Sequence, residues 1–232
     1  SNILSIFSLA VFDADGVGGD PPRLIAGASQ TVGGLPDHGI LQWDGNIWST
    51  MGDGLPPSSG WATGLAAVDP DGPGPASELL WCRSIGNAAQ SYLWDGQTWT
   101  AGPSGVGRLL AETVFDPDRT GGWPRLFVHS SEGVFMLNDG TLLDIGATTA
   151  GAPVESGQAN AFLGSIDLDG PGGQPAALWL SGYFSSLNGQ PAGFIARWEV
   201  TCLADFDGSG VVNVPDMFAF LSAWFSGDPA AD

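Results

Sequence analysis

Leu41-Gln42-Trp43-Asp44-Gly45-Asn46-Ile47-Trp48 has the pattern of two short strands joined by a tight turn. The Asp-Gly pair supplies the positive φ that a two-residue hairpin turn needs. The same pattern returns, about fifty residues apart, at Leu93-Trp94-Asp95-Gly96 and at Leu137-Asn138-Asp139-Gly140, each followed by another apolar segment. This recurrence predicts that the hairpin is one part of a repeated unit.

A second motif, Asp-x-Asp, recurs with the same spacing and begins at Asp13, Asp69, Asp116 and Asp167. A short apolar strand precedes each motif, and another follows a connection rich in Gly and Pro. Each repeat therefore predicts four antiparallel strands, which is the pattern of a β-propeller blade. We predict an all-β fold with an array of about four four-stranded blades at residues 1–57, 58–105, 106–150 and 151–199.

The fourth repeat ends at Ile195-Ala196-Arg197-Trp198 without a fourth strand. Propellers often close by completing one blade with strands from both chain ends, so we expect Ile3–Phe7 to supply the missing strand. A propeller fragment, cut at both ends, and a strained four-bladed ring are the alternatives. An unfinished array would expose apolar blade faces.

Residues 200–232 carry a different motif. Residues 205–216 place oxygen-bearing side chains at positions 1, 3, 5, 9 and 12 of a twelve-residue loop, with Gly210 at position 6, where the chain must turn sharply. This is the ligand plan of an EF-hand calcium loop, with Asp in place of the usual Glu at position 12 and a backbone carbonyl at position 7. The predicted Ca²⁺ ligands are Asp205, Asp207, Ser209, Val211, Asn213 and Asp216.

A helix should follow this loop. Pro215 suits a first helical turn, and Met217–Phe225 is an apolar run that Gly227 and Pro229 end. Only Ser222 is polar, so the helix needs a packing partner. A calcium loop with only its exiting helix resembles a dockerin half-module of planctomycete-type secreted proteins, and the Trp-Asp-Gly hairpins resemble kelch-like propeller repeats of secreted bacterial proteins.

The dockerin resemblance implies a calcium-dependent tail that docks onto a cohesin-like or cell-surface anchoring protein. Val214 and Pro215 occupy the recognition positions, and Phe218 and Leu221 lie on the docking helix. The apolar Val-Pro pair departs from the hydroxyl pair common in cellulosomal dockerins, so a distinct anchoring receptor is equally consistent. Dockerins carry two such segments, and Ala231-Asp232 repeats Ala204-Asp205, so we expect a second loop to follow.

The charge balance excludes one class of partner. The chain has 25 acidic residues against six basic ones, all Arg, and a net charge of −19. Phosphate binding needs a basic stripe, which excludes nucleic acid. No apolar run approaches the ~20 residues of a membrane span, so we expect no membrane insertion. With the resemblances, this composition implies a secreted or cell-surface protein.

Several tryptophans recur at fixed repeat positions, for which we favour packing between blades over an exposed platform for sugar rings: Trp43, Trp48, Trp94, Trp99 and Trp198. Trp61 and Trp123 stand in loop-like contexts and are the better candidates for ligand contacts, glycans among them. The Asp-x-Asp turns are interpreted as Asx turns. The alternative is a second calcium site at Asp13, Asp15 and Asp20.

Catalytic motifs are sparse. His129 and Cys82 are placed in the strand slot that Gly27 fills in the first repeat, which indicates packing rather than chemistry. No pair of carboxylates stands in a glycosidase motif. We predict a non-catalytic binding protein; the alternatives are a lectin-like propeller and a subunit, accessory or catalytic, in extracellular polysaccharide degradation. Cys202 has two alternatives, a disulfide to Cys82 or to a residue outside this sequence.

Overall fold

The computed structural model describes thirteen segments of the chain: residues 5–13, 21–29, 39–56, 59–69, 78–85, 90–116, 124–138, 140–147, 149–150, 161–168, 176–182, 184–198 and 214–226. The chain divides into two compact units, Ser1–Trp198 and Glu199–Asp232.

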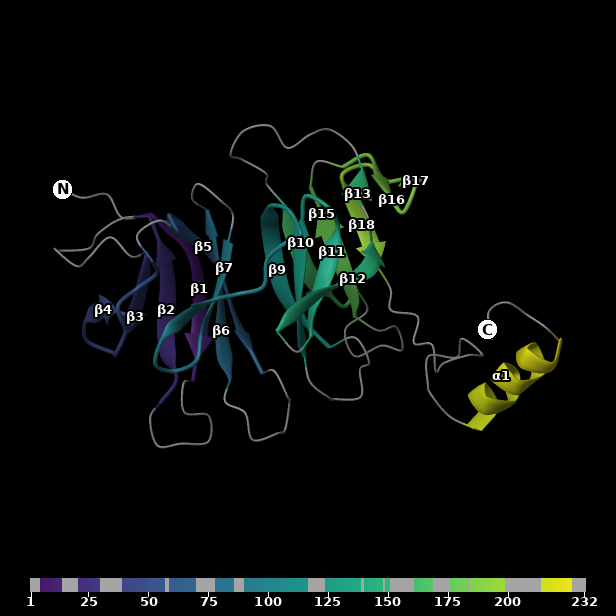
Figure 1. Cartoon of the computed structure of the whole chain (residues 1–232), viewed down its shortest axis with the longest axis horizontal. Coiled ribbons are helices and arrows are strands. Elements are labelled where there is room, and N and C mark those ends of the chain that lie inside the picture. Colours follow the sequence, from purple (N-terminus) through teal and green to yellow (C-terminus); the bar gives the residue numbers. More distant parts are fainter. Residues whose placement is uncertain are drawn as a thin grey trace. The chain divides into compact units, whose positions relative to one another are not determined.

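The first unit consists of small antiparallel sheets arranged as the four blades of a β-propeller (Figure 1), as the sequence predicts. In each of the first three blades, four strands follow one another in the same order in sequence and in space. These strands are β1 (Ile6–Phe12), β2 (Arg23–Ala28), β3 (Ile40–Trp43) and β4 (Trp48–Thr50); β5 (Trp61–Val68), β6 (Leu79–Ile85), β7 (Gln90–Trp94) and β8 (Trp99–Ala101); and β9 (Leu109–Phe115), β10 (Arg125–Ser130), β11 (Val134–Asn138) and β12 (Thr141–Ala147).

The fourth blade has three strands among the described residues, in the order β14 (Phe162–Ile166), β15 (Ala177–Ser181) and β18 (Ile195–Trp198). The residues that follow β18 lie outside the described residues, so the predicted loss of the fourth strand stays a prediction. A second small sheet joins β13 (Thr149–Ala150), β16 (Ser186–Leu187) and β17 (Gln190–Pro191). Its hairpin turns at Asn188 and Gly189, with φ of 50° and 74°, so an Asn-Gly hairpin signal was present in the sequence and was missed.

The expectation that Ile3–Phe7 completes the fourth blade is wrong for the described part of that segment. Ile6 pairs with Ala28, and the Ser29 N–H donates to the Ser5 carbonyl over 3.0 Å, which places both in the first blade. A register shift between Ile6 and Ser8 lets β1 continue through a bulge instead of ending. Residues 3 and 4 lie outside the described residues.

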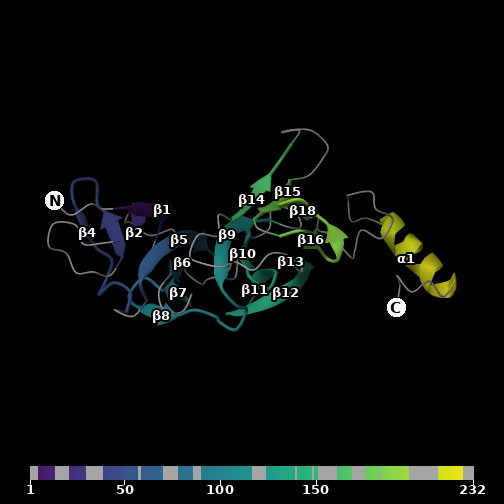
Figure 2. The ribbon, with the colours of Figure 1, turned by 90° about the horizontal axis from the view of Figure 1, so that it is seen from above.

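The inner strands β1, β5, β9 and β14 contact one another in succession, and the outer strands fan away from them (Figure 2). The hydrophobic core therefore lies between blades. One cluster joins Phe12 and Ile25 of the first blade to Leu80 and Trp94 of the second, with Trp99 packed against it. A second cluster joins the second blade to the third.

The recurring tryptophans of the interior blades confirm the packing interpretation. Trp94 is buried in the first cluster, and the Trp99 Nε1–H donates to the Met51 carbonyl of the preceding blade over 3.2 Å. Trp198 of the fourth blade lies 5.9 Å, centroid to centroid, from Phe127 of the third. Trp43 and Trp48 of the first blade are only partly buried.

The glycines of the Asp-Gly hairpins have the predicted positive φ, but the predicted two-residue separation occurs only between Asn138 and Thr141. The last paired residues of the first two hairpins, Trp43 with Trp48 and Trp94 with Trp99, are separated by four residues. Gly45, Gly96 and Gly140 have φ of 101°, 95° and 73°. In the first of them the Asp44 carboxylate accepts hydrogen bonds of 2.8 Å from the backbone N–H groups of Ile47 and Asn46. Those bonds, the one from Ile47 first, lower the pKa of Asp44.

The described part of the second unit is helix α1 (Val214–Ser226). It begins at Val214, so Pro215 lies in its first turn, as predicted. In the described part of the chain, no helix combines the length and the hydropathy needed to cross a membrane.

Candidate functional site

The first turn of α1 buries a carboxylate. Asp216 is only 4% exposed, although its neighbours Val214, Pro215 and Met217 are exposed. An ionised carboxylate is shielded from water at a large cost unless opposite charge or hydrogen-bond donors compensate it. The helix N-terminus supplies part of that compensation. Asp216, the residue predicted at position 12 of the calcium loop, is therefore a buried acidic side chain at the start of α1.

The other predicted ligands lie outside the described residues: Asp205, Asp207, Ser209, Val211 and Asn213. Their chemistry is that of a hard-cation site, since all of them offer oxygen. Within the segments that the structure describes, no group of three His, Cys, Asp or Glu side chains is placed to hold a metal ion. The arrangement of the loop stays a prediction.

The helix that follows exposes a large apolar surface. The predicted partner-binding residues Val214, Pro215, Phe218 and Leu221 are all exposed, and Phe225 is 82% exposed. The rings of Phe220 and Trp224 pack against each other, 6.1 Å apart. Contiguous apolar side chains of this size on a protein surface indicate a binding site.

Trp61, the predicted ligand contact of the first unit, is the first residue of β5 and is half exposed. Its ring stacks on that of Phe7, with centroids 5.9 Å apart and planes 18° from parallel. Two exposed aromatic rings from neighbouring blades therefore form one flat apolar patch. Trp123 lies outside the described residues.

Cys82 and His129, the two reactive side chains considered from sequence, are buried. The Cys82 thiol is free, so the structure does not show it in the disulfide that was one alternative, and burial raises its pKa. Burial also lowers the pKa of His129, to about 4. Both side chains lie in the packed interior, which is where the packing interpretation places them.

The slot assigned to Cys82 is wrong by one residue. Gly27 pairs with Ser8, five residues before Asp13, whereas Cys82 pairs with Leu65, four residues before Asp69. Arg83, which pairs with Gly64, holds the slot instead. Consecutive leucines at 79 and 80 make the two registers indistinguishable by hydrophobic pattern.

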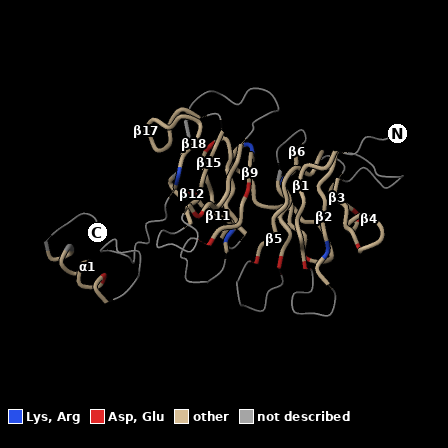
Figure 3. The backbone as a smooth tube through the Cα atoms, turned by 180° about the vertical axis from the view of Figure 1, so that it is seen from behind, with Lys and Arg blue, Asp and Glu red and all other residues tan. Residues whose placement is uncertain are grey.

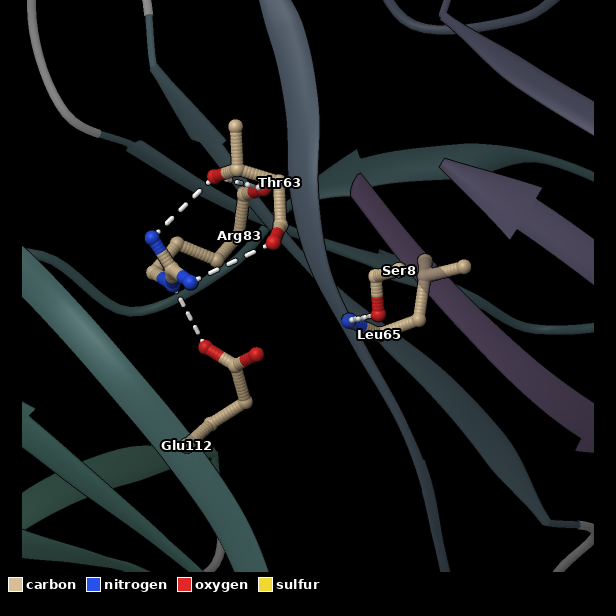
Figure 4. A network of polar contacts seen from close by, with 5 residues as sticks. All are labelled: Ser8, Thr63, Leu65, Arg83 and Glu112. Carbon is tan, nitrogen blue, oxygen red and sulfur yellow. Dashed lines mark hydrogen bonds and ion pairs between the residues drawn. The ribbon is translucent and has the colours of Figure 1, made fainter. Parts of the chain in front are cut away.

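Arg83 forms an ion pair between the second and third blades (Figure 4). Its Nε donates to the Glu112 carboxylate, and its terminal nitrogens donate to the Thr63 hydroxyl and carbonyl over 3.1 and 3.3 Å. Both charged side chains are mostly buried, and a Cβ at Gly64 would overlap the carboxylate. No sequence motif marks this pair, because its members come from different repeats.

The alternative calcium site at the first Asp-x-Asp turn is described only at Asp13, since Asp15 and Asp20 lie outside the described residues. The Asp13 N–H donates to the Glu78 carboxylate over 3.4 Å, and burial raises the pKa of Glu78. Acidic residues of the first two blades gather at this end of the strands (Figure 3).

Comparison with protein-family models, curated proteins and solved structures finds no match to this chain.

Proposed function

We propose that this chain is a non-catalytic, secreted or cell-surface binding protein. Its propeller unit is a scaffold for binding a ligand or a partner, and its terminal unit is a dockerin-like tail that calcium orders. The tail docks onto a cohesin-like or other anchoring protein at the cell surface. The burial of Asp216 beside an exposed apolar helix is the single observation that carries this proposal.

The burial of Asp216 and the exposure of the apolar helix belong to one mechanism. A divalent cation held by residues 205–216 would fix the start of α1, since Asp216 belongs to both the loop and the helix. The ordered helix then presents Phe218 and Leu221 to a partner, with Val214 and Pro215 beside the loop. An apolar helix face laid into a partner's groove is a common mode of recognition.

Calcium alone tests the site. The full chain, titrated with CaCl₂ in an isothermal calorimeter, should bind calcium with a dissociation constant on the order of 10⁻⁴–10⁻³ M, the range of extracellular modules. Asp216→Asn and Asp205→Ala should each weaken binding at least about tenfold, because each removes a charged ligand. Asp228→Asn, outside the loop, is the matched control. Equal binding by all three variants would show that calcium binds elsewhere.

Glycan binding by the propeller is the second candidate function, and the Phe7–Trp61 pair favours it. Sugar rings stack their apolar faces on exposed aromatic rings, so Trp61→Ala should weaken binding to a hit on a glycan array about tenfold or more, worth ~1.5 kcal/mol. Trp224→Ala, an equally exposed tryptophan of α1, is the control. An array without hits, or a hit that Trp61→Ala leaves intact, contradicts this candidate.

A further inference from the structure

Every interior interface of the propeller unit is built from the same two surfaces. We call the surface that a blade turns to the next blade its forward face, and the opposite surface its backward face. On the forward face, the residue before the turn aspartate is buried: Phe12, Val68 and Phe115 in the first three blades. The second-strand residue on that face is also buried, as Ile25, Trp81 and Phe127.

The backward faces receive the preceding blade in an equally regular way. Leu65 of the second blade and Leu163 of the fourth are buried at the same position, four residues before the turn aspartate. Trp94 packs against the first blade, and Trp198 packs on Phe127 of the third. The chain therefore contains three examples of one interface, forward face against backward face.

The backward face of the first blade is partly exposed in the described part of the chain. Leu9 and Val11 are 55% and 63% exposed, although their counterpart Leu65 is buried. The strand pairings put these two on one face with Leu24, Ala26, Leu41, Trp43, Trp48 and Thr50, of which Ala26 and Leu41 are buried and the others partly buried. None of them is charged. Trp43 and Trp48 lie 5.3 Å apart at 46°, nearly the geometry of Trp94 and Trp99 in the interior interface, at 5.3 Å and 47°.

The forward face of the fourth blade is likewise partly exposed in the described part of the first unit, although Ala177 on it is buried. Phe162 is 51% exposed and Ile166 is 37% exposed, whereas the counterparts of Ile166 in the other blades are buried. Trp179 holds the position of Trp81 and is only half buried. Among the described strand residues of this face, Arg197 is the one charged side chain. In a chain with 25 acidic residues, neither free face carries a carboxylate in its described strands.

We propose that two copies of this chain associate head to tail, the backward face of each first blade on the forward face of the other copy's fourth blade. The two free faces are the two halves of the interface that the chain already forms three times. The backward face of one copy is therefore complementary to the forward face of another copy, and neither face is complementary to its own equivalent. Trp43 then packs on Trp179 of the second copy, as Trp198 packs on Phe127.

Two copies make a ring of eight blades, the upper end of the usual range for propellers. A heterologous contact that closes in this way gives a finite ring, whereas one that does not close gives a filament. The association uses only the propeller unit, so it is independent of calcium and of the proposed docking tail.

Sedimentation velocity of the full chain tests this proposal, in 0.5 M NaCl to screen the net charge of −19 and with EDTA present. At ~50 µM, the wild-type chain should sediment as two copies. Leu9→Asp and Phe162→Asp should each raise the dissociation constant on the order of 100-fold, because each places an unpaired carboxylate in both interfaces of the ring. Both side chains are exposed within one copy, so the variants should keep the wild-type circular dichroism spectrum, which shows that they still fold.

Ile47→Asp and Phe225→Asp are matched controls, because both replace an exposed apolar side chain outside the two faces. Both should remain dimers. Mixing Leu9→Asp with Phe162→Asp should restore a heterodimer, since the pair retains one intact interface. A wild-type monomer or a ladder of larger species overturns the proposal. The proposal is also overturned if only one of the two face variants dissociates, because this indicates a symmetric contact. It is overturned as well if Phe225→Asp dissociates, because this assigns the contact to α1.

Discussion

Replacing Glu112 with alanine should lower the free energy of unfolding by about 3–5 kcal/mol, the cost of breaking a buried ion pair by removing one member. Arg83 lies between the second and third blades with little access to water, and Glu112 is its only ion-pair partner among the described residues. Without the carboxylate, a guanidinium stays buried and unneutralised. Urea denaturation followed by tryptophan fluorescence measures the loss.

Glu132→Ala is the control for this prediction, because Glu132 is exposed in the same blade. It should change the free energy of unfolding by no more than about 0.5 kcal/mol. The double variant Arg83→Met, Glu112→Leu should recover most of the lost stability, since apolar groups of similar volume can replace a buried pair at little cost. If Glu112→Ala unfolds at the urea concentration of Glu132→Ala, the pair does not stabilise the interface between these blades.

Acidification should destabilise the propeller unit through His129. Burial lowers the pKa of this imidazole to about 4 in the folded chain, against about 6.5 in the unfolded chain. The unfolded state therefore binds a proton first, and the stability present above pH 6.5 is lost as the pH falls toward 4. The loss should reach about 2 kcal/mol at pH 5 and about 3 kcal/mol at pH 4.

His129→Leu should remove this part of the pH dependence, because leucine takes up no proton. The surroundings accept an apolar side chain: the imidazole lies between blades near Gly182, and its Nδ1 has no hydrogen-bond partner among the described residues. Urea denaturation of both proteins at pH 7, 6, 5 and 4 isolates the contribution. A titration of the imidazole by NMR with a midpoint near 6.5 would contradict the prediction directly.

The strands, their turns and their number per blade could be predicted from sequence, because the information is local. Asp-Gly requires a positive φ, and Gly45 and Gly96 adopt it. Alternating apolar residues predict a strand wherever they occur. The same local signals mark residues 205–216 and α1, so the candidate calcium site was proposed from sequence, and the structure adds the burial of Asp216.

Pairing register and contacts between repeats could not be predicted in this way. Leu79-Leu80 fits two registers, and only the pairing of Cys82 with Leu65 identifies the correct one. Arg83 and Glu112 are 29 positions apart and carry no motif, so nothing in the sequence brings them together. Ile6 belongs to the first blade because a bulge extends β1, which no hydrophobic pattern reveals.

Blade formation follows from local signals in the chain, because hairpin chemistry and strand periodicity act over a few residues. Which apolar side chains are covered depends instead on the packing of one blade against another. Leu9 and Leu65 stand at the same position of their repeats, yet one is exposed and the other is buried. The reason is physical: burial depends on whether a neighbouring blade lies against the strand, and only the order of blades in space determines that.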